Sequence, residues 1–343
     1  MIYKVNIDNF DRKEWERCAK EFTDYTIYQT WAYQSIRAEN DKQKISRIII
    51  KDANENTVLM AQVRIKKLSI VGPSVGYVQF GPLVRDKQNG LSCTADALAE
   101  FRRAYVGLFV SLLRVAPNIY KGQLGDQLES MLESAGFRKN RNVAPYHTIL
   151  VSLIESEDEM FSRIYKEGRR LIRRAGEKDI DIADYTSDES FEILETMYLK
   201  AKRRKGFAGI HSGQFRRVQL ALADGEKMRI IIARIDGKPV STQAISHFGE
   251  MAIPVVFAND PKGLKSGAAY LLWWRSYLTS KKLGMKYYDL GGIDPDNNPE
   301  GYLFKKRMGG EEQFHIGAFD AYDNFVIRSM FAAAEKVYRK FRN

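Results

Sequence analysis

An internal repeat limits what this chain can fold into more than any other feature of its sequence. The segment RIIIKDANENTVLMAQVRI begins at Arg47, and RIIIARIDGKPVSTQAISH begins at Arg229. Each is typical of a β-branched strand, a polar turn and a second strand that contains a glutamine, Gln62 or Gln243. In the second copy the turn is Asp-Gly, a strong hairpin signal. The repeat predicts two copies of one structural unit.

The elements that follow each hairpin occur in the same order. After the first hairpin come the strand VGYVQFGPLV, an amphipathic helix over about 94–106 and the apolar strand LFVSLLRVAP. After the second come MAIPVVFAND, a helix over about 267–282 and the strand MKYYDLGG. Between them, ESEDEM predicts a helix start capped by Ser156. We therefore expect an α/β fold with mixed sheets in two tandem domains, over residues 1–150 and 151–319.

Charge and composition narrow the function. Lys and Arg outnumber Asp and Glu by 54 to 43, and the net charge of +11 favours polyanionic partners such as nucleic acid, phosphorylated intermediates or an anionic membrane face. Solubility alone is the plainer explanation. The N-terminus has no apolar signal segment, and the longest apolar run, YVGLFVSLL, is far shorter than a membrane span. Two distant cysteines and four scattered histidines show no metal-ligand spacing. These features predict a cytoplasmic protein without a cofactor or metal.

Several catalytic motifs are missing from the sequence. It has no GxxxxGK[ST] phosphate loop, no GxGxxG after a strand and no HExxH. What remains is group transfer by positioning and electrostatic stabilisation, which requires few special side chains.

The stretch KYYDLGGIDPDNNPEGYLFKKRMGG, residues 286–310, is the best candidate for such a site. Ligands of α/β folds bind beyond the carboxyl ends of strands. Asp289 ends the strand, where it could orient a substrate amine or cap a neighbouring turn, and Gly291-Gly292 permit close backbone approach. Three adjacent cations follow, of which one can point into the cleft; they are Lys305, Lys306 and Arg307.

Two other segments are candidates for binding. A predicted helix carries four arginines at spacings of three and four, which place them on one side of the helix, as a phosphate-binding or a merely solvated face; they are Arg169, Arg170, Arg173 and Arg174. In YQTWAYQSIRAEN, Trp31 opens a short helix, and Arg37 lies a turn and a half further on. Trp31 can be a core anchor or part of a ligand site.

Several of these segments, in this order, resemble the Fem-type aminoacyltransferases that build peptidoglycan interpeptide bridges (the FemABX family). They are YQTWAYQSIR, FGPLVRD, GFRKNRNVAPYHTILVSL, the hairpin at 229–245 and YYDLGGIDPDNNPEGYLFKKRMGG. The resemblance covers about residues 25–320 and is most specific at YDLGG…LFKK. It implies two domains like the acyl-CoA N-acyltransferases (GNAT-like), in the compact form without a coiled-coil arm. It also allows the last helix, within 320–343, to pack on the first domain.

The reaction implied by the resemblance moves an amino acid from aminoacyl-tRNA to an amine on the stem peptide of a UDP- or lipid-linked peptidoglycan precursor. An ester is already activated, so this transfer needs neither a metal nor a protein nucleophile. Both substrates are polyanions, in agreement with the net charge. Peripheral contact with the inner face of the membrane is a further expectation.

Residue roles follow from the same resemblance. Phe304 and Lys305 match the family's Phe-Lys pair, whose lysine is implicated in catalysis or phosphate binding, and Trp31 matches the tryptophan of the precursor-binding segment. Three family positions differ here: a basic residue falls at Ser35, an arginine near Ile210-His211, and a pocket tyrosine at Phe257. Arg37 is the nearby candidate to replace the basic residue. The predicted catalytic residues are Lys305 and Asp289. The predicted substrate-binding residues are Trp31, Arg37, Phe257, Gln243, Gly291, Gly292 and Phe304, and the predicted tRNA- or phosphate-binding residues are Arg169, Arg170, Arg173, Arg174 and Lys306.

Two alternatives stay open. An acyl-CoA-dependent N-acyltransferase acting on an amino sugar or polysaccharide precursor would use PKGLKSGAA as a pyrophosphate-binding turn, with Ser266 capping the next helix. An RNA-binding protein would use the arginine face at 169–174, although that face lacks the interleaved aromatic residues of a single-strand platform.

Overall fold

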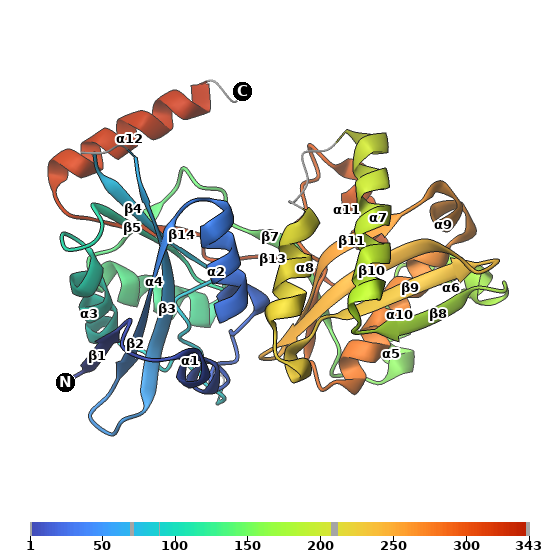
Figure 1. Ribbon diagram of the computed structural model, residues 1–343, viewed down its shortest axis with the longest axis horizontal. Helices are drawn as coiled ribbons and strands as arrows, with labels where there is room; N and C mark the ends of the chain where they lie inside the picture. The colour runs from blue at the N-terminus through green and yellow to red at the C-terminus, as the bar shows by residue number, and fades with distance from the viewer. Residues whose placement is uncertain (1, 69–71, 89, 207–211, 341–343) are drawn as a thin grey trace. The chain divides into compact units, whose positions relative to one another are not determined.

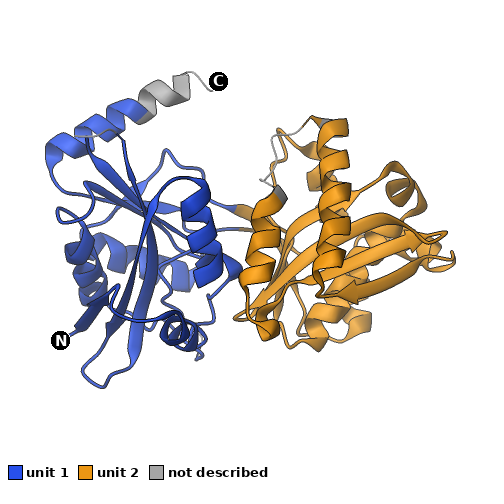
Figure 2. Ribbon diagram, viewed as in Figure 1, with its two compact units in different colours: residues 1–146, 314–343 blue, residues 147–313 orange. Residues whose placement is uncertain are grey.

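The chain folds into two compact units in the computed structural model, which describes residues 2–68, 72–88, 90–206 and 212–340. One unit comprises Met1–Tyr146 and Phe314–Asn343, and the other comprises His147–Gln313 (Figure 2). The sequence placed these boundaries at 150 and 319. The chain returns to the first unit at Phe314 because the strand Ala318–Tyr322 is paired within the first sheet.

The first unit is built on a seven-stranded sheet in the order β1-β2-β3-β4-β5-β14-β6 (Figure 1). Its strands are β1 Lys4–Ile7, β2 Lys44–Lys51, β3 Thr57–Lys67, β4 Ser74–Gln79, β5 Leu112–Ala116, β6 Arg138–Asn140 and β14 Ala318–Tyr322. Its helices are α1 Arg12–Ala19, the 3-10 turn Ile27–Gln29, α2 Trp31–Asn40, α3 Ala95–Tyr105, α4 Gln123–Ser134 and α12 Phe325–Lys340. A core of β-branched and aromatic side chains, including Ile48, Val63 and Phe101, joins the sheet to α3 and α4.

The second unit has a seven-stranded sheet in the order β13-β7-β12-β11-β10-β9-β8. Its strands are β7 His147–Ser152, β8 Asp181–Tyr185, β9 Arg229–Ile235, β10 Lys238–Phe248, β11 Met251–Asn259, β12 Tyr287–Asp289 and β13 Glu311–Phe314. Its helices are α5 Glu157–Arg163, α6 Lys166–Gly176, α7 Asp188–Lys205, α8 Ser212–Ala221, the 3-10 turn Asp224–Glu226, α9 Pro261–Ser266, α10 Ala268–Lys282 and α11 Pro299–Arg307. Figure 1 shows α7 in front of this sheet and α10 behind it.

The repeated order of elements predicted from the sequence is confirmed. In the first unit β2, β3 and β4 are antiparallel neighbours, and after α3 the chain enters β5, which is parallel to β4. In the second unit β9, β10 and β11 are antiparallel neighbours, and after α10 the chain enters β12, which is parallel to β11. The fold class is therefore α/β with two GNAT-like units.

Local signals explain where several elements begin. The Ser156 side chain accepts a hydrogen bond from the Glu159 amide, and the Glu159 carboxylate accepts one from the Ser156 amide, which completes the predicted cap of α5. The sequence did not predict α11. Its signals are nevertheless present, because Pro299 occupies the first turn and the Asn298 side chain accepts from the Gly301 amide at 3.1 Å.

The close contact between α6 and α11 depends on Gly168. A Cβ atom at this position would lie 2.3 Å from the Arg307 carbonyl oxygen at the end of α11. We expect Gly168→Ala to lower the free energy of unfolding by about 1–3 kcal/mol, because one of the two helices must move. Urea unfolding measures this change.

Gly176 offers a matched control in the same helix, since a Cβ there would meet no heavy atom within 4 Å. Gly176→Ala should leave the stability unchanged or raise it by up to about 1 kcal/mol. Equal effects of the two substitutions would contradict the role of Gly168 as the contact point.

Candidate active site

The strand β12 ends in a turn that is fixed by a buried carboxylate. Asp289 is 1% exposed, and its Oδ1 accepts hydrogen bonds from the Gly291 amide at 2.7 Å and from the Thr148 hydroxyl. Gly291 has φ of +78°, a conformation that L-residues with side chains rarely adopt. Of the two roles expected for Asp289, the turn cap is thus observed directly.

The helix α11 then brings Lys305 back to this turn. Phe304 lies 4.6 Å from the Tyr270 ring and 5.3 Å from the Trp273 ring, both on α10 (distances between ring centroids). This packing fixes the last turns of α11. The Lys305 ammonium donates to the carbonyl oxygens of Gly291 at 3.0 Å and Gly292 at 2.8 Å.

Lys305 is a buried cation, with 8% of the residue exposed. Burial lowers the pKa of Lys305 to about 8, and the negative charge of Asp289 acts in the opposite direction. The side chain is therefore mostly an ammonium at neutral pH. An ammonium has three N–H donors, and the two glycine carbonyls take two of them. Among the described residues, no acceptor is recorded for the third N–H.

The structure separates the three neighbouring cations of this segment. The Lys306 ammonium donates to the Tyr302 hydroxyl at 2.9 Å and lies 3.9 Å from the Glu312 carboxylate. Arg307 is exposed, and its guanidinium reaches the Tyr270 hydroxyl at 3.5 Å. Lys305 alone among the three is buried.

The two units differ at the parallel strand pair beside this site. In the first unit β4 and β5 stay paired over five successive positions, from Val75–Leu112 to Gln79–Ala116. In the second unit β11 and β12 pair only at Met251–Tyr287 and Ala252–Tyr288. Beyond that point β12 turns at Gly291, where an added Cβ would lie 3.5 Å from the Lys305 Nζ. Among the described residues, the parallel pairing thus ends after two positions in the second unit, near Lys305, and continues over five positions in the first.

Gln243 and Phe257 lie opposite each other on β10 and β11. Gln243 is fully buried, whereas Phe257 is 40% exposed and packs edge-on against Trp273 at 5.7 Å. Trp273 also contacts Phe304. The predicted residues Phe257 and Phe304 therefore share one aromatic neighbour, and Gln243 is the cross-strand partner of Phe257.

The Trp31 segment forms a separate cluster in the first unit. The Arg47 guanidinium lies 3.5 Å from the centre of the Trp31 ring and donates to the Ser35 hydroxyl at 2.6 Å. Burial lowers the pKa of Arg47 to about 10, so it remains a cation at neutral pH. Arg37 instead pairs with Asp41 at 2.8 Å. The cation beside Ser35 is thus Arg47 of β2, which sequence reasoning noted only as the first residue of the repeat.

The four arginines of α6 have different surroundings. Arg169 donates to the carbonyl oxygens of Ser162 and Ile164, and Arg170 is paired with Glu167 at 2.7 Å. Arg173 lies over the Phe161 ring at 5.3 Å, and both Arg173 and Arg174 are exposed. These arginines therefore share a solvated surface on which Arg170 is already neutralised. The positions at Ile210-His211 lie outside the described residues.

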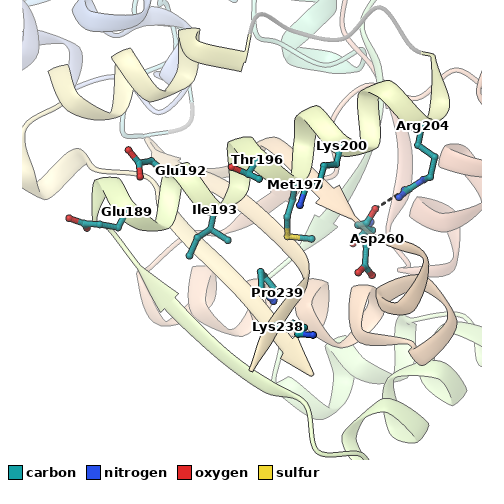
Figure 3. A pocket seen from close by; sticks show the side chains of 11 residues that line it. Glu189, Glu192, Ile193, Thr196, Met197, Lys200, Arg204, Lys238, Pro239 and Asp260 are labelled. Atoms are coloured by element: carbon teal, nitrogen blue, oxygen red, sulfur yellow. Dashed lines mark hydrogen bonds between the residues drawn. The ribbon is translucent and has the colours of Figure 1, made fainter. Parts of the chain in front are cut away.

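A second feature of this unit was not predicted. A groove with a volume of about 730 Å³ lies between α7, the start of β10 and the end of β11, and Figure 3 shows the side chains that line it. Ile193 and Met197 contribute apolar surface to it. Along α7, carboxylates line one end and cations the other; the charged lining residues of α7 are Glu189, Glu192, Lys200 and Arg204. In the sequence, the spacing of these four charged residues places them on one side of a helix, and this pattern could have predicted the groove.

The loop considered for CoA binding is covered in the structure. The N-cap of α10 is Gly267, and an added Cβ there would lie 3.0 Å from the Leu171 carbonyl oxygen of α6. Ser266 does not form the predicted helix cap, although its hydroxyl accepts from the Ala268 amide at 3.3 Å. The Lys178 ammonium donates to the Ser266 carbonyl at 2.9 Å. A pyrophosphate could not approach this helix start without moving α6.

Comparisons with known proteins agree with this arrangement. Residues 160–305 match the family described as the acetyltransferase (GNAT) domain. The crystal structure of FemX aligns with a TM-score of 0.81 at 14% identity, covering 96% of this chain and 100% of FemX. L-PGS from Bacillus licheniformis aligns with a TM-score of 0.56 at 13% identity, covering 95% and 96% of the two chains. A conserved protein of unknown function from Bacteroides thetaiotaomicron aligns with a TM-score of 0.57 at 13% identity, covering 93% and 100%.

The search of curated proteins found no match. At such low identities the structural likeness establishes the fold, and the domain match in the second unit establishes the class of enzyme. The chain is therefore an acyltransferase with a GNAT domain over residues 160–305, and its two units together have the fold of the Fem-type aminoacyltransferases.

Proposed function

We propose that this protein transfers an amino acid from an aminoacyl-tRNA to an amine of a peptidoglycan precursor. The observation that carries the proposal is the buried Lys305 ammonium, held by two glycine carbonyls where β11 and β12 diverge. Its remaining N–H can stabilise the oxyanion that forms when an amine attacks an ester carbonyl. We expect the acyl group to lie beside Lys305, where the pairing of β11 with β12 ends.

The reaction needs little else from the protein. The acceptor nitrogen forms a bond to the ester carbon, the bond from that carbon to the ribose oxygen breaks, and a proton from the amine passes to the ribose oxygen. An ammonium at this position also helps to hold a phosphate of the RNA end. Asp289 acts through Lys305 as a positioning residue, because its carboxylate is buried and accepts hydrogen bonds from the Gly291 amide and the Thr148 hydroxyl.

The covered start of α10 favours an RNA-linked donor over acyl-CoA. CoA-dependent transfer would use this helix start for a pyrophosphate, and α6 lies against it. Cations for an RNA backbone are available elsewhere in the unit. Arg173 and Arg174 are exposed on α6, and Arg203 is exposed on α7. Within the described part of the chain, none of the three forms an ion pair with a carboxylate.

In the first unit, the cluster of Trp31, Ser35 and Arg47 supports binding of the acceptor. Arg47 supplies a fixed cation beside an aromatic ring, an arrangement that suits a phosphate linked to a flat or sugar group. Arg47 takes the role that Arg37 was expected to fill.

A direct test compares donors in single-turnover assays with a UDP-linked pentapeptide as acceptor. We expect transfer from aminoacyl-tRNA and none above background from acetyl-CoA. Uncharged tRNA should also bind, with an affinity that falls steeply as salt is raised. Transfer from acetyl-CoA, or tRNA binding that is insensitive to salt, would contradict the proposed donor.

A further inference from the structure

A group of exposed apolar side chains gathers at one end of the first sheet. Its members come from three segments, namely the end of β3, the loop before β5 and the first turns of α12, and each is between 41% and 76% exposed. We call this group the apolar tip; it consists of Leu68, Leu108, Phe109, Phe325, Val326 and Met330. Single exposed apolar residues are ordinary, but a contiguous group marks a contact surface.

Hydrogen bonds to backbone carbonyl oxygens hold the three segments together. Ser74 at the start of β4 donates from its hydroxyl to the Phe109 carbonyl at 3.1 Å. The Asp323 amide, just before α12, donates to the Ser111 carbonyl at 3.0 Å. The Leu68 amide donates to the Pro73 carbonyl across the β3–β4 turn. Figure 1 shows the start of α12 near the strands β4 and β5, and the hydrogen bond of Asp323 to Ser111 places it at the first residues of β5.

The helix α12 turns only one side toward the sheet. Ile327 and Phe331 are half-buried, whereas Phe325, Val326 and Met330 are exposed. The helix therefore has two apolar sides, one against the sheet and one facing outward. The outward side has no partner among the described residues. Such a side is stable only when another apolar phase covers it.

The charges around the apolar tip are mainly positive. Lys66, Lys67 and Arg328 are exposed at its edge, with the Asp323 carboxylate as the nearby acid. Within the described residues none of these three cations has a carboxylate within 4 Å, so their charge is not neutralised by the protein.

We infer that the apolar tip docks this protein on the surface of an anionic lipid bilayer. Apolar side chains that project from loops and a helix can enter the interface of the bilayer, while the flanking cations meet lipid phosphates. The positive charge around the apolar tip favours an anionic bilayer over another protein. A protein surface of mixed charge would leave Lys66, Lys67 and Arg328 without anionic partners. The contact is peripheral, since no helix in the described ranges is long and apolar enough to cross a bilayer. The inference does not depend on the proposed reaction.

The test is sedimentation of the full chain with two kinds of vesicle. One kind contains phosphatidylcholine alone, and the other contains equal amounts of phosphatidylcholine and phosphatidylglycerol. We expect binding to the anionic vesicles, and weaker binding by about tenfold or more for the double variant Phe325→Asp, Val326→Asp. Lys66→Gln with Lys67→Gln should weaken binding to the anionic vesicles only.

Leu220→Asp is the matched control, since Leu220 is 58% exposed on α8 in the second unit. This variant should bind vesicles as the wild type does. Thermal unfolding checks that each variant is folded, and aminoacyl transfer to a soluble acceptor should be unchanged by the tip substitutions. Unchanged vesicle binding by the double tip variant, or a concentration-dependent dimer abolished by it without any vesicle binding, would overturn the inference.

Discussion

Replacing Lys305 with alanine should slow aminoacyl transfer by about a hundredfold or more. The loss corresponds to removing one preorganised oxyanion donor, which costs about 2.7–4 kcal/mol in transition-state stabilisation. Lys305 is positioned for this role by its bonds to Gly291 and Gly292 and by the packing of Phe304. A single-turnover assay with saturating substrates separates this effect from substrate binding.

Lys306→Ala is the matched control for this prediction. Lys306 has the same charge and is the next residue along the chain, but its ammonium is bonded to the Tyr302 hydroxyl on the outer side of α11. We expect it to lose less than about tenfold in rate. Small and equal losses for the two variants would mean that the cations form a surface charge cluster and that the active site lies elsewhere.

Removing the charge of Asp289 should move the pH dependence of transfer. If the Lys305 ammonium is the active form, the rate is highest below the pKa of Lys305 and falls as the pH rises through about 8. Asp289 favours the ammonium, so Asp289→Asn should lower the pKa of Lys305 and shift this fall to lower pH. Near pH 8 we expect a loss of about tenfold, and a much smaller loss well below that pH.

Asparagine keeps the Oδ1 acceptor used by Thr148 and the Gly291 amide, so this substitution changes charge more than geometry. Asp294→Asn provides the control, because Asp294 is exposed in the same loop and bonds only locally to Asn297. The measurement is the single-turnover rate across pH. A profile with the same descending limb in wild type and Asp289→Asn would show that Lys305 is not the titrating group.

The two units share one order of elements but differ at the hairpin and at the parallel strand pair. In the first unit, the Gln62 side chain donates hydrogen bonds to the backbone carbonyl oxygens of Gln29 and Thr30. The segment before α2 therefore packs against this side of the β2–β3 hairpin. The β4–β5 pair of that unit is closed along its length. The corresponding β11–β12 pair is open beyond Ala252, and a buried cation lies at the opening. We therefore propose that the second unit carries out the chemistry and that the first unit binds the acceptor.

The sequence determined the features that depend on neighbours along the chain. Strand hairpins, the Ser156 cap and the helices over 95–105 and 268–282 follow from local patterns of polar and apolar residues. The glycine pair after β12 and the aromatic residue before Lys305 could also be read locally, since a turn and an anchored side chain each need only a few adjacent residues. These patterns were enough to predict the fold class and to place Lys305 at a strand end.

Contacts between distant residues were decided by the tertiary structure alone. Arg47 reaches Trp31 and Ser35 across a helix–strand contact, and β14 joins the first sheet from the far end of the chain. The burial of Lys305, but not of Lys306, likewise appears only when the elements around α11 are packed, whereas the ion pair of Arg170 with Glu167 is local, three residues apart on α6. Side-chain surroundings depend on which elements meet, and local patterns contain no information about that choice. Local patterns thus singled out Lys305 as the predicted catalytic residue, while only the packed structure shows what surrounds it, the carbonyl oxygens of Gly291 and Gly292.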